Sequence, residues 1–354
     1  MSPDTAKTKK DQRAIRKSTA AAHERRSATT SLPERFRVEG DSLVLDGVSI
    51  GFQRTLRVGE EGVNWLPPSL GQFPLRAVDP VAHRLPEAVA ARGGVLLPLY
   101  VREALWINLD SAEPVAVQIA TGGVCIASGR PLKDRLTRRP QNYVVLPEQP
   151  WVDGFKTASG EVRQFVGVSK GSGLSVEQQL TGSDDVGGIQ IQVWRLTPAA
   201  LKRWKAQQRR TAHISYAMSH PMLVESTMLG VGAGGRIRQE IYRDPFTKDD
   251  WQRTPAARCW IHLVSATEWR SITGEVPPPT PVTPERYNAA GLPWFDYYDA
   301  DADDLPTTDE LASIKSIGEL EGSDPDPEWV HPDGLPVIRY GDRRPRFVES
   351  GAWL

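Results

Sequence analysis

Cysteine and long apolar runs are what this sequence has least of. Its 354 residues include only Cys125 and Cys259, too few for a disulfide framework. Both lie in apolar, strand-like stretches, which predicts buried free thiols. No stretch approaches the roughly 18 apolar residues of a membrane-spanning helix, and the first residues lack the apolar segment of a secretory signal. We therefore expect a soluble protein of the cytoplasm.

Motifs for metals and cofactors are also missing. The six histidines and two cysteines never fall at zinc-ligand spacing. Gly230, Gly232 and Gly235 match the pattern G-x-G-x-x-G, but a dinucleotide site needs a strand before that pattern and a helix after it. No apolar strand leads cleanly into these glycines, so we expect neither a metal nor a cofactor.

The acidic residues near position 300 leave one metal alternative open. Asp299, Asp301, Asp303 and Glu310 occupy positions 1, 3, 5 and 12 of an EF-hand calcium loop. The match is poor, because Asp304 stands where that loop needs glycine. A solvated acidic loop is therefore the favoured interpretation of this stretch, with calcium binding as the alternative.

Charge is unevenly distributed, although the net charge is only −1. Residues 1–31 hold eight Lys or Arg against three Asp or Glu, and almost no large apolar residues. Such a segment cannot offset the entropy of ordering, so we expect a disordered basic tail. Residues 293–334 hold thirteen Asp or Glu against one Lys, which makes the late part of the chain strongly acidic.

Short runs of strand-forming residues, many turns and 29 prolines characterise the rest of the chain. This pattern predicts an α+β protein that is mainly β, with an antiparallel sheet or sandwich and a few short helices. The clearest local unit is a strand at 160–168, a helix at 175–182 and a strand at 187–194. Ser175 and Gln178 fit a capping box at the start of that helix, and Gly182 fits its end.

Changes in composition divide the chain into four predicted parts. They are a disordered basic tail at 1–31, a β-rich globular body at 32–276, a proline-rich linker at 277–283 and a helical, acidic C-terminal appendage at 284–354 that packs on the body.

A basic helix is predicted at 198–210, capped by Thr197. Lys202, Lys205 and Arg209 would share one of its faces, as an anion-binding helix requires. Together with the basic tail, this face could contact nucleic acid. The alternative is an ordinary solvated surface helix.

Two segments hold the densest groups of possible ligand-contacting side chains. The first contains Glu148, Trp151 and Asp153, where an aromatic face beside a carboxylate suits a sugar or another polar ring-shaped ligand. The second contains four residues that would share one face of a strand. They are Arg236, Glu240, Tyr242 and Asp244. The alternative interpretation is structural, with the tryptophan packed under a loop and the polar face turned to solvent.

Several segments resemble a group of uncharacterised microbial proteins. They are VLPEQPWVDGF, VRQFVGV, SGLSVEQQLTG, GGIQIQV, GAGGRIRQEIYRDPF and GLPWFDYYDADA. The similarity runs from about Val48 to about Leu320. The resemblance implies one whole, recurring protein, and it carries no activity or ligand to transfer.

Because no nucleophile–base pair or metal cluster is recognisable, the sequence favours a binding or scaffold protein of unknown ligand. Its eleven tryptophans, several in polar loops, are typical of binding surfaces. The alternative is a glycosidase-like hydrolase that uses carboxylates from 148–153 and 240–244. Such an enzyme needs two carboxylates about 5 to 10 Å apart across a cleft.

Overall fold

The computed structural model describes residues 36–60, 62–67, 69–208, 229–279 and 303–322, and the backbone of two short strands at 294–297 and 337–340. The predictions for the tail at 1–31, for Arg209, and for Asp299 and Asp301 therefore lie outside the described residues.

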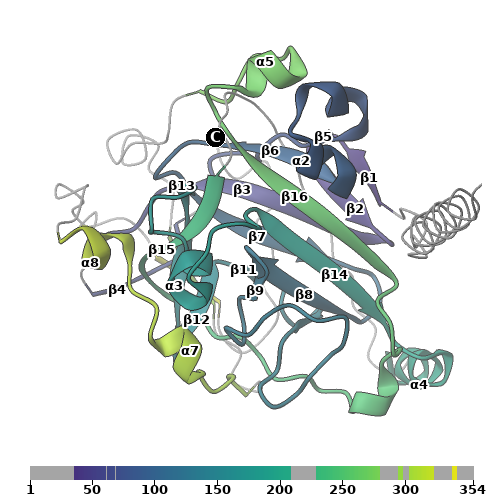
Figure 1. Cartoon of the computed structure of the whole chain (residues 1–354). Coiled ribbons are helices and arrows are strands. Elements are labelled where there is room, and N and C mark those ends of the chain that lie inside the picture. Colours follow the sequence, from purple (N-terminus) through teal and green to yellow (C-terminus); the bar gives the residue numbers. More distant parts are fainter. Residues whose placement is uncertain are drawn as a thin grey trace, which may run out of the picture. The chain divides into compact units, whose positions relative to one another are not determined.

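Two mixed sheets form the body, which confirms the prediction of a mainly β, α+β protein (Figure 1). The first sheet contains β1 (Phe36–Glu39), β2 (Ser42–Leu45), β3 (Val48–Thr55), β7 (Ala104–Asp110), β13 (Glu161–Ser169), β15 (Leu229–Arg238) and β4 (Val63–Asn64), with β11 (Trp151–Val152) and β12 (Gly154–Ala158) beside this path. The second contains β10 (Val144–Leu146), β8 (Val115–Thr121), β14 (Ile189–Arg195), β16 (Ala257–Ser265), β6 (Val95–Leu99) and β5 (Arg76–Ala77), with β9 (Val124–Cys125) beside β8. A separate parallel pair joins β17 (Trp294–Tyr297) to β18 (Val337–Tyr340).

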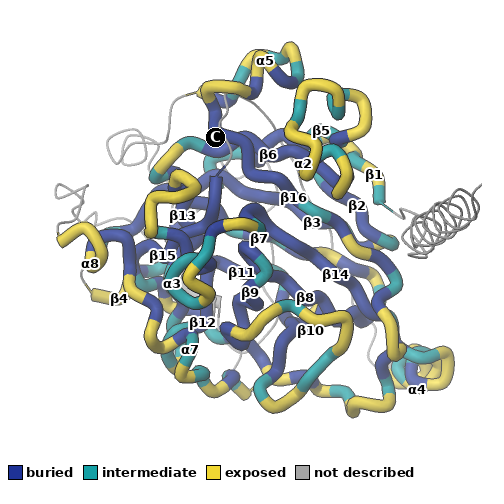
Figure 2. The backbone as a smooth tube through the Cα atoms, in the orientation of Figure 1, coloured by how far each residue is buried: buried dark blue, intermediate teal, exposed yellow. Residues whose placement is uncertain are grey.

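Most strand pairs are antiparallel, but β15 pairs with β4, and β16 with β6, in parallel. The helices are short and lie around the sheets (Figures 1 and 2). They are η1 (Asp79–Arg84), α2 (Glu87–Arg92), α3 (Val176–Thr181), α4 (Pro198–Gln208), η2 (Lys248–Asp250), α5 (Trp269–Thr273), α7 (Asp309–Ala312) and α8 (Ile317–Glu321). Within the described ranges, none of these helices has the length and hydropathy to cross a membrane.

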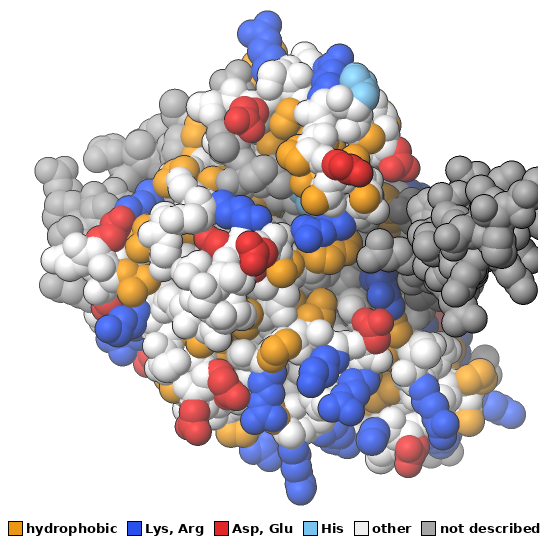
Figure 3. Space-filling model, in the orientation of Figure 1, with side chains coloured by type: hydrophobic (Ala, Val, Ile, Leu, Met, Phe, Trp, Pro, Cys, Tyr) orange, Lys and Arg blue, Asp and Glu red, His pale blue; other side chains and the backbone are white. Residues whose placement is uncertain are grey.

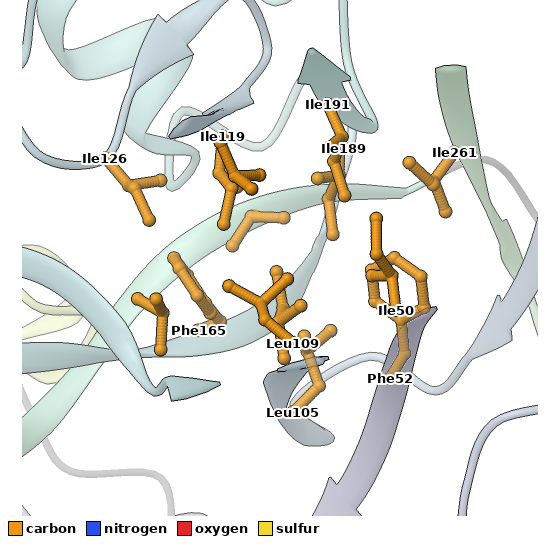
Figure 4. Close-up of a cluster of buried hydrophobic side chains, with 14 of the residues drawn as sticks. Ile50, Phe52, Leu105, Leu109, Ile119, Ile126, Phe165, Ile189, Ile191 and Ile261 are labelled. Carbon is orange, nitrogen blue, oxygen red and sulfur yellow. The ribbon is translucent and has the colours of Figure 1, made fainter. Parts of the chain in front are cut away.

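The main core lies between the two sheets. Figure 4 shows Ile119, Ile189 and Ile191 of the second sheet pointing toward Leu105 and Phe165 of the first. All five side chains are at most 1% exposed. Burial of each such side chain contributes roughly 1.5–3 kcal/mol, so contact between the sheets is the main source of stability.

Strand alternation decides which side chains enter this core. In β14, Ile189, Ile191 and Val193 point inward, as the sequence predicts. Gln190 and Gln192 point to the outer face, yet they are only 3% and 6% exposed. The outer face of β14 is therefore covered rather than open to solvent.

The predicted strand–helix–strand unit is confirmed as β13, α3 and β14. The Ser175 hydroxyl accepts a hydrogen bond from the Gln178 N–H, and Gly182 ends α3 with a φ of 79°. The expected capping box forms only in half. The Gln178 side chain donates to the Gly182 carbonyl instead of reaching back to the backbone of Ser175.

Gly230, Gly232 and Gly235 all lie inside β15. No strand-to-helix turn follows them, so the described backbone does not form the dinucleotide-binding arrangement. The register between β13 and β15 shifts where Gly234 and Gly235 lie. A Cβ on Gly235 would come within 2.0 Å of the Gly59 carbonyl oxygen. Gly234 and Gly235 therefore allow a β-bulge, and Gly235 also allows the Gly59 backbone to approach closely.

Residues 303–322, which we call the strap, run across the body. Leu311 and Ile314 enter the main core, and Ile317 packs with Val166 and Val168 of β13. The strap forms two short helices, α7 and α8, because Ser316 starts a second helix with its own capping box.

Asp304 fixes the start of the strap. Its carboxylate accepts hydrogen bonds from Lys156 Nζ at 2.6 Å, the Gly160 N–H at 2.8 Å and the Ile241 N–H at 3.0 Å. Lys156 is fully buried, and an unpaired buried ammonium would be very costly. Lys156 therefore needs the Asp304 carboxylate to pair its buried charge, and the same ion pair holds the start of the strap on the body.

The strap predicts a stability difference between two of its leucines. Leu311→Ala should lower the free energy of unfolding by about 2–5 kcal/mol, because the side chain is fully buried. Leu320→Ala, at a residue 37% exposed in the same strap, should change it by less than about 1 kcal/mol. Urea denaturation followed by tryptophan fluorescence measures both. Equal effects of the two changes would contradict the described packing.

Candidate functional site

The two segments singled out in the sequence lie side by side. The Gln149 side chain donates to the Glu240 carbonyl at 3.2 Å and accepts from the Tyr242 N–H at 3.0 Å. The Gln239 side chain accepts from the Asp153 N–H at 2.9 Å. The two segments are therefore joined by hydrogen bonds between uncharged amide side chains and backbone groups. The amides belong to Gln149 and Gln239, which were not among the predicted site residues.

Asp244 is buried and occupied by contacts within the fold. Its carboxylate accepts hydrogen bonds from the Tyr143 hydroxyl at 2.5 Å, Trp251 Nε1 at 2.9 Å and the Phe246 N–H at 2.7 Å. Arg138 Nε lies 4.0 Å away. Burial, and then the Asp244 charge, raise the pKa of the Tyr143 hydroxyl. These contacts give Asp244 a structural role.

Asp153 is the least satisfied of the predicted carboxyls. It is 1% exposed, and neither of its carboxyl oxygens accepts a hydrogen bond of normal geometry. Burial raises the pKa of Asp153 well above its usual range, and an interaction with the Trp151 side chain only partly opposes this. Burial also lowers the pKa of Lys156, against the opposing effects of Asp304 and Glu240. Asp153 is therefore an enclosed carboxyl, and its burial favours the neutral form.

The remaining predicted residues do not converge on one surface. β15 ends at Arg238, so the expected strand face from Arg236 to Asp244 does not form. Arg236 Nη1 lies 3.6 Å from a Glu161 carboxylate oxygen. Glu148 and Trp151 are half-buried, and Trp151 packs against the main core. The structure brings the segments together, but it does not place their side chains around an open cleft.

A different region presents charge outward. Residues 128–142, which we call the basic loop, cross the outer face of the second sheet between β9 and β10. Gln118 of β8 and Asn142 both donate to the Arg135 carbonyl, at 2.9 and 3.1 Å. The Asn142 side chain also accepts from the Thr137 N–H at 2.8 Å. The backbone of the loop is thus held from beneath.

Side-chain contacts fix the basic loop further. Asp134 accepts hydrogen bonds from Gln192 and Arg258 of the sheet, both at 3.0 Å. Leu136 packs on a second cluster of buried residues that contains Trp194, and Leu201 of α4 packs on the same cluster. The loop and α4 therefore rest against a shared apolar base.

The exposed cations of this region form what we call the basic surface. Figure 3 shows Lys and Arg side chains gathered across the lower part of this face, over the basic loop and toward α4. Four of them are exposed and form no ion pair with a described residue. They are Lys133, Arg135, Arg139 and Lys202.

Other cations of the basic surface already have partners within the fold. Arg130 lies 3.3 Å from Glu310, and Arg258 lies 3.0 Å from Asp134. Arg138 donates to the Asp244 carbonyl at 2.9 Å. All three remain exposed, so their charges still contribute to the field outside the molecule.

The basic helix expected at 198–210 is described as α4, which ends at Gln208. Lys202 is exposed, whereas Lys205 Nζ lies 2.5 Å from a Glu113 carboxylate oxygen. None of the predictions from sequence falls on the basic loop. Its signal is nevertheless visible, because residues 130–139 hold five Lys or Arg against one Asp.

The calcium alternative rests on two residues that the structure describes. Asp303 lies 3.6 Å from Arg243, and Glu310 lies near Arg130. Among the described residues, no group of three or more His, Cys, Asp or Glu is arranged to hold a metal ion. Both cysteines are buried and free.

Comparisons with protein-family models, curated proteins and solved structures found no match to this chain.

The raised pKa of Asp153 predicts a pH effect on stability. A carboxyl in the unfolded chain loses its proton near pH 4, whereas folded Asp153 keeps its proton to higher pH. Unfolding then releases a proton, so wild-type stability should fall relative to Asp153→Asn as pH rises above about 4, by up to about 1.4 kcal/mol per pH unit. Urea denaturation between pH 4 and 8 measures this.

Asp185→Asn is the control, because it changes an exposed carboxyl. Its stability profile should run parallel to that of the wild type. If the Asp153→Asn profile also runs parallel to the wild type, Asp153 is not held neutral by the fold.

Proposed function

We propose that this protein is a binding protein that holds a polyanionic partner at the basic surface. The observation that carries the proposal is a loop whose backbone is hydrogen-bonded to side-chain amides while its cations point outward. Gln118 and Asn142 hold the Arg135 carbonyl from beneath, while Lys133 and Arg139 remain exposed. A pre-organised loop loses little conformational entropy on binding, which favours affinity.

The burial of Asp153 and Asp244 supports a binding function over the hydrolase alternative. Glycoside hydrolysis needs two carboxylates on either side of an open cleft. Asp153 and Asp244 are 1% and 4% exposed, and Asp244 already has three hydrogen-bond donors. Under this proposal the protein works in the cytoplasm, where its free cysteines stay reduced.

Heparin is a suitable first probe, since it is a linear polyanion. The protein should bind fluorescently labelled heparin, and the Kd should rise steeply with added NaCl. Arg135→Ala with Arg139→Ala should weaken binding roughly tenfold at low salt, because each exposed ion pair contributes up to about 1 kcal/mol. Fluorescence anisotropy titrations measure the Kd.

The matched control is Arg270→Ala with Lys315→Ala. It removes the same charge from exposed residues of α5 and the strap, outside the basic loop and α4. This control should bind heparin as the wild type does. Equal weakening by both double variants, or no binding by the wild type, would overturn the proposal.

A further inference from the structure

The identity of the polyanion can be narrowed, on the condition that the proposed binding function holds. Four features of the basic surface bear on it: the kind of cation, the state of nearby aromatic rings, the burial of side-chain amides and the position of exposed apolar residues. We propose that the basic surface binds duplex nucleic acid through its phosphates, without reading base sequence.

Arginine dominates the basic surface. Four of the five cations of the basic loop are arginines (Arg130, Arg135, Arg138 and Arg139) against one lysine, Lys133. The planar guanidinium matches phosphate oxygens with two parallel hydrogen bonds, which ammonium cannot do. A duplex carries one phosphate charge per roughly 1.7 Å of its axis. Because phosphates recur at this short spacing, the arginines of the basic surface can contact phosphates at any position along a duplex.

Among the residues that the structure describes, the aromatic rings near the basic surface do not offer a platform for unpaired bases. Trp260 of β16 has the Arg92 guanidinium 4.7 Å from its ring centroid. The same indole stacks with His262 at 6.1 Å and 12°. Trp204 of α4 is partly buried on the cluster beneath the basic loop. Single-strand binding depends on stacking of bases on open rings, so this surface favours a duplex.

Beneath the basic loop, the side-chain amides of the sheet, a group that reads adenine in the major groove, are buried. Gln118, Gln190 and Gln192 face the same side of the sheet but are at most 6% exposed. Gln118 and Gln192 bind the basic loop, and Gln190 binds the Gly187 carbonyl. The basic surface therefore supplies contacts that position a duplex and few that specify its sequence.

Exposed apolar residues lie elsewhere, which disfavours a membrane partner. The large hydrophobic residues that the structure shows as exposed are Val63, Val101, Val276 and Leu320. None belongs to the basic loop or to α4. Peripheral membrane binding combines cations with apolar side chains that enter the lipid, and the described part of this surface lacks the second component.

Fluorescence anisotropy with a labelled DNA duplex of about 20 base pairs, two helical turns, tests the inference. The full chain should bind the duplex more tightly than either of its single strands, and a duplex of shuffled sequence equally well. Arg135→Ala with Arg139→Ala should reduce the slope of log Kd against log[NaCl] by about 2. Arg135→Lys with Arg139→Lys should weaken binding, but less than the double alanine change, because the charge stays and the paired hydrogen bonds to phosphate are lost. Arg270→Ala with Lys315→Ala should keep all of the affinity.

Phosphatidylserine vesicles and poly-glutamate are competing anionic ligands, and they distinguish failure of this inference from failure of the proposed function. If heparin binds but the duplex does not, or if vesicles or poly-glutamate bind more tightly than the duplex, the inference is wrong and the proposed polyanion binding stands. Tighter single-strand binding, or a tenfold preference between duplex sequences, would also overturn it. If heparin does not bind, the proposed function itself fails.

Discussion

Buried side-chain amides tie several loops of this protein to its sheets, and the basic loop depends on them. A loop that crosses a sheet must satisfy its own backbone groups away from water. Gln118 does this for the basic loop, Gln149 for the segments near Tyr242, and Gln164 for Leu56 and Val58. A neutral amide offers both a donor and an acceptor without the desolvation penalty of a buried charge.

The fold was predictable to the extent that its core follows from local patterns. Alternation in 189–193 gave the inward face of β14, and Ser175 and Gly182 gave the ends of α3. The covering of the outer face was not predictable. Gln190 and Gln192 have the pattern of a solvent-facing strand, but they are buried because a loop distant in sequence lies over them. Local periodicity contains no information about such long-range contacts.

The candidate site was likewise predictable only in its local features. The sequence identified 148–153 and 236–244 as polar segments, and the structure places them together through Gln149 and Gln239. It could not show that Asp153 would be enclosed, since burial depends on contacts with residues distant in sequence, such as Gln239. The basic loop was missed for a different reason. A charge run is usually a solvated surface, and only its anchoring by Gln118 and Asn142 separates it from one.

Neutral anchors and charged contacts respond differently to solution conditions. The hydrogen bonds from Gln118 and Asn142 to the Arg135 carbonyl involve no net charge, so salt and pH near neutrality leave them intact. The field of Lys133 and Arg139 is screened over about 10 Å at 0.1 M salt. Salt can therefore release a polyanion from the basic surface without loosening the loop that presents it. Binding would be reversible, and the surface would remain formed for the next partner.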